Sequence, residues 1–593
     1  MSSGSVKQDP LETSDRGAAL VMVMAVGMVL SMLMAILVVV SVNGARQASK
    51  DADWNAALAA AYAGVDEYQS RLSADTSYYR FGNSAAPFSK ESGSVLVAPS
   101  GSNANPAFGI GVTGTWGAVN GSGGRAQFRY EVDNSTYATS GRIRVRSTGK
   151  VGDVTRTVTA DLKQQGFIDF LYFTDYEVQD PDIVGKPDKG CYKDPDTRTV
   201  LKYAWETRTA SDCNEITFAS RDVITGPVHS NDTIRTCGTR FEGTVTTANT
   251  KSPITVNGSG CAETTFTLAG YPTRSDGVIG MPATNSELKK ETRSDLEDSD
   301  VPRPGCLYTG PTQFTFAANG TVTIKSPFTK MTRIGNAAAS VGSAPDECGK
   351  ITDLQSPAGA TIPVPENNVL YVQNVPAVSG DVNYWAPSAT PAKFSCTSTA
   401  SNKGRRGWTF DGVGYPVADE VAADPTPYAC RAGDAFVSGR FKGAATVSAE
   451  NYVFVVGDIT YVDAKEDILG LVGNNAVWVF NPLDSLRKPL LGKNRTINAA
   501  ILSVAHTFQV QNYSQGGRRG DLTVLGAIAQ KYRGPVGTTS GGSINNGYVK
   551  AYTYDERFKF KAPPKFLNPV TTTYGVTTWV ESAAAFLANG AAR

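Results

Sequence analysis

The chain has 593 residues, of which 41% are hydrophobic and 19% are charged, so it is long enough for several domains. Its 56 basic and 55 acidic residues leave a net charge of +1, and no long run of one sign occurs. Neither nucleic acid nor an acidic lipid surface is therefore an expected partner. The 59 glycines, the many Thr, Ser, Asn and Val residues and the lack of Leu/Glu/Lys-rich stretches predict a mainly β protein, with its helix confined to the N-terminus.

The first predicted element is a membrane-spanning helix over Ala18 to Val42. These 25 residues carry no charge, and a hydrocarbon core of about 30 Å needs around 20 helical residues. A cleaved secretory signal has an apolar run of only about 7–15 residues, followed by a cleavage site of small residues. Because this run is longer and "VSVNGARQ" after it is a poor cleavage site, we expect the helix to remain in the mature protein.

The helix is predicted to continue beyond the membrane, as far as residue 75. Alternate spacings of four and three residues place an apolar stripe on one helical face: Trp54, Leu58, Ala61, Val65, Tyr68 and Leu72. Abundant alanine adds helix propensity, and no proline interrupts Ala18 to Leu72. An amphipathic helix packed on its own domain is one interpretation, and a helix for packing in a filament is the other.

Two stretches of this region stand out: "RGAALV" (Arg16 to Val21), after a short charged leader, and "AAAYAGVDEYQSRL", which ends at Leu72. Both resemble the N-terminal region of PilX-type minor type IV pilins and pseudopilins. The resemblance implies that a prepilin peptidase cleaves between Gly17 and Ala18 on the cytoplasmic face. It also implies partners among other pilin-like subunits.

Met22 departs from the major pilins, which carry Glu at the fifth position of the mature chain. The absence of that carboxylate removes one assembly contact, since a carboxylate in lipid needs a partner. Met22 therefore favours a minor or tip role over a bulk subunit, and it equally permits a protein that never assembles.

All eight cysteines follow the apolar run: Cys191, Cys213, Cys237, Cys261, Cys306, Cys348, Cys396 and Cys430. An even number on one side of a membrane segment predicts disulfides in an oxidising compartment. Metal binding is the alternative, but there is no CxxC pair and neither histidine is near a cysteine. Pairing neighbours in order is the simplest connectivity, and other connectivities stay open. Charges flanking the helix are balanced, so the cysteines decide the orientation: N-terminus in the cytoplasm and the bulk outside.

The predicted fold is mainly β with a long N-terminal helix: a pilin-like helix with a small antiparallel sheet, then a right-handed parallel β-helix. A β-sandwich is the alternative to the β-helix. The predicted regions are a leader (1–17), the helix (18–75), a small sheet on the helix (76–165), early β-helix coils (166–271), a disulfide-bearing insertion (272–434), and later coils with a C-terminal tail (435–593). Many short β-prone pieces between glycine-containing turns support the coils. Stretches such as "GPVHSNDTI" and "GAIAQKYRGPVG" also resemble β-helical regions of unknown function that accompany PilX-type N-termini.

One polar cluster has residue types suited to cleavage of a polysaccharide: Glu215, Asp222, His229, Ser230, Asn231 and Asp232. A polar turn after Gly226-Pro227 explains "HSND" more simply, because its side chains satisfy backbone donors. His506 lies in an apolar strand and is expected to be a hydrogen-bonded wall residue. We predict no catalytic residue.

Three further motifs are weak. "GIGVTG" (Gly109 to Gly114) lacks the following helix that a pyrophosphate site needs. "DADWNA" at Asp51 begins like an EF-hand loop, but Ala56 replaces the required glycine. "SDLEDSD" (Ser294 to Asp300) is expected to be a solvated acidic loop. We predict no cofactor and no metal ligand.

The favoured function is a non-enzymatic, single-pass membrane protein with its bulk outside the cell, a minor pilin-like component of a type IV pilus or related filament. It would prime or cap a filament, or bind a surface ligand, and the filament could carry it out of the bilayer. The second hypothesis is a cell-envelope β-helix protein with an uncleaved signal anchor. A surface polysaccharide lyase or hydrolase is the third.

Overall fold

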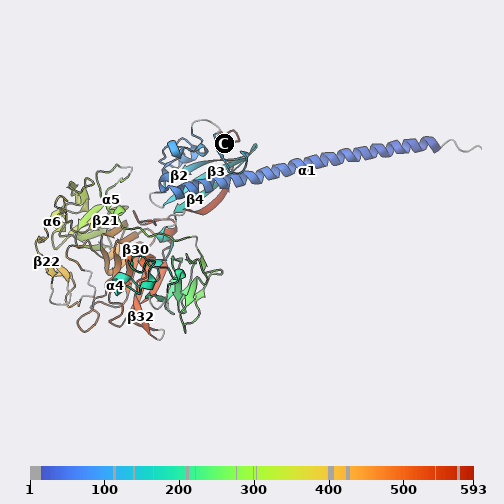
Figure 1. The fold of residues 1–593 in the computed structure, drawn as a ribbon. Helices are drawn as coiled ribbons and strands as arrows, with labels where there is room; N and C mark the ends of the chain where they lie inside the picture. The colour runs from blue at the N-terminus through green and yellow to red at the C-terminus, as the bar shows by residue number, and fades with distance from the viewer. Residues whose placement is uncertain are drawn as a thin grey trace, which may run out of the picture. The chain divides into compact units, whose positions relative to one another are not determined.

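The computed structural model describes residues 15–110, 115–137, 141–164, 166–208, 213–220, 222–274, 277–297, 300–301, 303–398, 406–421, 428–540, 543–569 and 574–593. It confirms a mainly β protein with one long N-terminal helix (Figure 1). The chain divides into two compact units. Unit 1 comprises Met1–Tyr137, Arg142–Lys163 and Tyr574–Arg593, and unit 2 comprises Ala138–Gly141 and Gln164–Thr573.

Unit 1 is a five-stranded sheet packed against helix α1 (Asp15–Ala74). The strand order is β1-β2-β3-β4-β34. The strands are β1 (Gly117–Ala118), β2 (Ala126–Asp133), β3 (Arg142–Val151), β4 (Val154–Gln164) and β34 (Tyr574–Ser582), and a short helix α2 covers Pro87–Glu91. The first four strands pair antiparallel as neighbours along the chain. The fifth strand, β34, comes from the range 435–593, for which the sequence predicts later coils and a C-terminal tail.

Helix α1 meets the sheet through the apolar stripe that its sequence predicts. Ala61, Val65, Tyr68 and Leu72 are completely buried, whereas Trp54 at the start of the stripe is 51% exposed. The contact is backbone to backbone at Gly149, where a Cβ atom would lie 2.1 Å from the carbonyl oxygen of Ala57. A side chain at this position would therefore push the helix off the sheet.

Unit 2 consists mainly of strands, which range from two residues in β6 to 16 in β30. The first group is β5 (Tyr172–Tyr176), β6 (Thr217–Phe218), β7 (Val223–Thr225), β8 (Val228–Ser230), β9 (Ile234–Thr236), β10 (Arg240–Phe241), β11 (Val245–Thr247), β12 (Thr255–Asn257), β13 (Thr265–Phe266) and β14 (Thr273–Arg274). The second is β15 (Cys306–Thr309), β16 (Thr312–Ala317), β17 (Thr321–Lys325), β18 (Arg333–Ile334), β19 (Gly342–Ser343), β20 (Ala360–Pro363), β21 (Asn368–Gln373), β22 (Phe394–Ser398), β23 (Arg406–Phe410) and β24 (Val413–Tyr415). The third is β25 (Ala435–Phe441), β26 (Ala444–Ala449), β27 (Tyr452–Tyr461), β28 (Ile468–Gly473), β29 (Ala476–Val479), β30 (Arg495–Val510), β31 (Arg518–Tyr532), β32 (Gly537–Ser540) and β33 (Ser543–Tyr554). The short α-helices of this unit are α4 (Pro181–Val184), α5 (Ser286–Lys290) and α6 (Ile351–Leu354).

Within the described part of the chain, twenty-one strands belong to one large sheet, and most of its ladders are parallel. Many of these ladders pair strands that are not consecutive, such as β26 with β28 and β28 with β30, whereas β30 pairs in parallel with the consecutive strand β31. One continuous column of paired, buried residues crosses nine strands: Cys306, Leu370, Val447, Leu471, Ile501, Ile528, Tyr172, Val228 and Val245. A parallel β-helix requires such ladders, and an antiparallel β-sandwich lacks them. The parallel β-helix itself, with the winding and hand of its coils, stays a prediction.

The order of rungs differs from the order of the chain. Strand β5, early in unit 2, pairs with β31, and β7 pairs with β33. The early strands therefore continue the stack where the late strands end. Six described strands of the expected insertion (272–434) also belong to the large sheet: β14, β15, β16, β17, β20 and β21. Only β18–β19 and β22–β24 of that range form small sheets of their own.

Four disulfides cross-link segments of unit 2. They join neighbouring cysteines in order: Cys191–Cys213, Cys237–Cys261, Cys306–Cys348 and Cys396–Cys430. Each closes a loop of 22 to 42 residues, which restricts the unfolded chain.

Candidate functional site

The N-terminal half of α1 is apolar and exposed. Every large apolar side chain from Leu20 to Val42 lies on the surface. Among the described residues, one helix is long and apolar enough to cross a membrane: Ala19–Ala74, whose best window has a mean hydropathy of 2.8. Because exposed apolar surface costs about 25 cal/mol per Å² in water, this half of the helix needs an apolar environment.

The expected processing residues lie at the beginning of this helix. Gly17 and Ala18 both have helical backbone, and the surroundings of their side chains lie outside the described residues, as does the leader before Asp15. Met22 is 72% exposed. The structure therefore places the expected cleavage point within the first turns of α1, ahead of the apolar segment.

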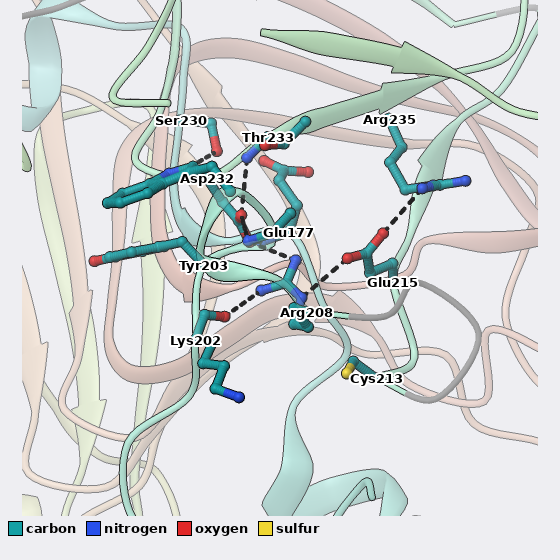
Figure 2. A network of polar contacts seen from close by, with 12 residues as sticks. Glu177, Lys202, Tyr203, Arg208, Cys213, Glu215, Ser230, Asp232, Thr233 and Arg235 are labelled. Carbon is teal, nitrogen blue, oxygen red and sulfur yellow. Dashed lines mark hydrogen bonds and ion pairs between the residues drawn. The ribbon is translucent and has the colours of Figure 1, made fainter. Parts of the chain in front are cut away.

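The polar cluster around His229, which the sequence favours as a structural turn over a catalytic site, is buried in hydrogen-bonded and ionic networks. In the first, Arg208 is completely buried between two carboxylates (Figure 2). Its Nη2 lies 2.7 Å from Asp232 Oδ2 and its Nε lies 2.9 Å from Glu215 Oε1. Burial alone would lower the pKa of Arg208, but the two carboxylates raise it above its ordinary value, so the guanidinium is charged.

Asp232 also organises the backbone around it. Its carboxylate accepts hydrogen bonds from the backbone N–H groups of Glu177 at 3.0 Å, Ala204 at 2.7 Å and Thr233 at 2.8 Å. The backbone N–H of Asp232 donates in turn to the Ser230 hydroxyl at 3.1 Å. This is the use of "HSND" that a polar turn predicts, because the side chains satisfy buried backbone donors.

His229 belongs to the second network. Its Nδ1 lies 2.8 Å from the Thr246 hydroxyl and its Nε2 lies 3.2 Å from Asn231 Oδ1. The ring stacks on Phe173, and burial lowers the pKa of His229 to about 4. A neutral imidazole with both nitrogens engaged has no free nitrogen to accept a substrate proton.

Two further ion pairs lie in the same part of unit 2. Arg533 Nη1 contacts Glu177 Oε2 at 2.8 Å, with both side chains 1% exposed. Lys550 Nζ contacts Asp222 Oδ2 at 2.6 Å. Neither Arg533 nor Lys550 was singled out by sequence, because basic residues hundreds of positions from their acidic partners leave no local signal. The absence of catalysis stays a prediction.

The other weak motifs of the sequence do not point to a ligand site. Gly111 to Gly114 of "GIGVTG" lie outside the described residues, as do two residues of "SDLEDSD". The residues of "DADWNA" are all in α1, where a calcium loop has no place. His506 lies in β30 as expected, and its Nδ1 contacts Asp180 Oδ2 at 2.7 Å.

No family model matches the sequence, and no curated protein matches it. Among solved structures, the chain is similar to the competence-associated pilin ComZ from Thermus thermophilus. The match covers 89% of this chain and 97% of that chain, with 10% sequence identity and a TM-score of 0.25. Values this low carry no argument about function, so the case for a function has to come from the residues of this chain.

Proposed function

We propose that this chain is a non-enzymatic, membrane-anchored surface protein that assembles as a minor pilin-like subunit. The observation that carries the proposal is the division of α1. Residues 20–42 expose only apolar or small side chains, and the same helix then packs its second half on the sheet of unit 1. A continuous helix thus joins a lipid-soluble segment to a folded unit.

Physical chemistry supports insertion of the first half of α1 in a bilayer. A helix satisfies its own backbone hydrogen bonds, which is required in lipid. At 1.5 Å per residue, the segment from Ala18 to Val42 is roughly 37 Å long, enough to span a core of about 30 Å with some tilt.

The disulfides support an outward orientation. All four lie in unit 2, and disulfides form and persist in oxidising compartments. The N-terminus then faces the cytoplasm, where a prepilin peptidase cleaves between Gly17 and Ala18. The released helix packs with other pilin-like subunits, and unit 2 is displayed outside the cell, where it binds a surface ligand.

The N-terminal residue of protein purified from native membranes tests the proposal, by intact mass and terminal peptide sequencing. We expect a mature chain that starts at Ala18. Gly17→Val should leave the full-length precursor in the membrane. Gly27→Val is the matched control, because it is the same substitution in the same helix, with open space around the new side chain.

A wild-type chain that still starts at Met1 or Ser2, or a Gly17→Val variant processed normally, would contradict cleavage. The protein would then be an uncleaved signal-anchored component of the cell envelope. Recovery in sheared surface filaments would separate a filament subunit from a protein that stays in the membrane.

A further inference from the structure

His506 lies at a corner of the large sheet. Strand β30 pairs with β28 as far as Ser503 and with β29 from Phe508 onward. Between these two ladders the backbone N–H of His506 donates to the carbonyl of Asn475 at 2.9 Å. The imidazole is 18% exposed, so it is held in place and still open to solvent on one side.

Two carboxylates from a distant part of the chain reach this corner. Asp180 is the N-cap of α4 and Asp182 lies in its first turn. Asp180 and His506 are 326 residues apart in the sequence, yet one potential ligand atom of each of Asp180, Asp182 and His506 lies within 4.8 Å of the others. Asp180 is 1% exposed and Asp182 faces solvent.

The charges at this corner are not balanced. No described Lys or Arg forms an ion pair with Asp180 or Asp182, in contrast to the Arg and Lys partners of Asp232, Glu177 and Asp222. A buried carboxylate without a cation is costly, so a cation bound at this corner would be favourable.

A buried hydroxyl nearby also lacks a partner. Tyr192 is 2% exposed, and its hydroxyl makes no hydrogen bond with any described residue. Burial raises the pKa of Tyr192, the charge of Arg198 lowers it and the charge of Asp182 raises it, so this hydroxyl lies within electrostatic range of both charged groups. Such a group is expected to meet a water or an ion in the protein.

We propose that Asp180, Asp182 and His506 bind a divalent transition-metal ion, with zinc as the representative case. An imidazole combined with two carboxylates suits zinc, whereas calcium and magnesium take oxygen ligands. The geometry requires little movement. Ligand atoms about 2.1 Å from a tetrahedral ion are roughly 3.4 Å apart, so His506 Nδ1 and Asp180 Oδ2 would separate by less than about 1 Å from their present 2.7 Å.

The metal would join segments that lie on the two sides of β31. The segment with Asp180 and Asp182 follows β5, and His506 belongs to β30, while β5 and β30 flank β31 on its two sides. A metal bound here would tie the early strands of unit 2 to the late strands, and binding to the folded state alone would stabilise unit 2.

Equilibrium dialysis with elemental analysis tests the site on the full-length protein in detergent, after removal of metals with a chelator. We expect one high-affinity Zn²⁺ per chain, and a zinc-dependent rise in Tm. Asp182→Asn and His506→Gln should each weaken zinc binding by at least about 10-fold and abolish the rise in Tm. Neither change disturbs a completely buried side chain, so both variants should fold.

Asp188→Asn is the matched control, because Asp188 is an exposed N-cap six positions from Asp182 and the amide keeps the cap. It should bind zinc as the parent does. Zinc binding that is unchanged in both test variants, or absent in the parent, would overturn the site. A rise in Tm with Ca²⁺ but not with Zn²⁺ would overturn it as well, since it would show a carboxylate site without His506.

Discussion

The two units bury their cores by different pairings of the chain. In unit 1, β2, β3 and β4 are neighbours in sequence and pair antiparallel, and α1 covers them. In unit 2, parallel ladders join strands from distant parts of the chain, as where Tyr172 pairs with Ile528. Unit 1 therefore depends on one close contact between helix and sheet, whereas unit 2 depends on the stacking of many short rungs.

The two units also differ in how deeply their ion pairs are buried. The ion pairs of unit 1 keep a partly exposed partner, as in Arg144 with Asp161. Unit 2 buries whole pairs, as in Arg208 with Asp232 and Arg533 with Glu177. A buried pair contributes little net stability while intact, but loss of one partner leaves an uncompensated charge. Unit 2 should therefore be the more sensitive to loss of a single charge.

The largest expected effect is in unit 2. Arg208→Met removes the cation between Asp232 and Glu215 and should lower the free energy of unfolding of unit 2 by about 3–5 kcal/mol. Urea denaturation followed by fluorescence and proteolysis of unit 2 measures this. Arg240→Met is the control, because its pair with Glu242 is exposed and contributes at most about 1 kcal/mol. A cost below about 1 kcal/mol for Arg208→Met would contradict the charge argument.

Disruption of the contact between α1 and the sheet should destabilise unit 1 and leave unit 2 folded. Gly149→Val places side-chain atoms against the backbone of Ala57 and Ala61, and overpacking of this kind costs about 3 kcal/mol. Limited proteolysis should show early cleavage in unit 1 with unit 2 still protected. Gly575→Val in β34, where a new Cβ meets open space, should change little. Equal loss of protection in both units would argue against their independence.

A pH-dependent effect should follow from Asp434. Burial raises the pKa of Asp434 to about 7 from its ordinary 3.8, so the unfolded chain releases this proton at a lower pH than the folded protein does. This group therefore lowers stability as pH rises from about 4 to about 7. Asp434→Asn mimics the protonated acid and should stabilise the protein at pH 8 by on the order of 2 kcal/mol, with no gain near pH 4.

Unfolding free energies of both proteins across this range measure the effect. Burial lowers the pKa of His229 to about 4, so His229 gives the opposite trend: its contribution is lost as pH falls from about 6.5 to about 4. That contribution is common to both proteins and cancels in their difference. A difference that does not grow with pH would refute the role of Asp434.

The smallest effect is expected at the exposed beginning of the apolar stripe. Trp54→Ala loses a contact in which the Arg156 guanidinium lies 4.6 Å from the ring centroid, which is worth about 0.5–1 kcal/mol. Tyr68→Ala, on the same helical face but completely buried, should cost about 3–5 kcal/mol. Thermal unfolding of both variants compares them, and similar costs would show that Trp54 is buried in the protein.

The sequence alone determined the elements whose signals are local. The uncharged run from Ala18 to Val42 and the stripe from Leu58 to Leu72 predict α1. Both signals are local, because helical periodicity is visible in residues that are three or four positions apart. The alternation in β3 and the turn at Gly152, between β3 and β4, indicate the hairpin of these two strands for the same reason. The resemblance to pilins also rests on these local stretches.

Only the tertiary structure decided which distant segments meet. Strand β34 completes the sheet of unit 1, and β5 stacks on β31, because a strand's pattern shows which face is buried but not which strand lies beside it. The partners Arg208–Asp232 and Asp180–His506 follow from that stacking. Long-range pairs of this kind are fixed by the free energy of the whole packed stack, and no window of sequence contains both members.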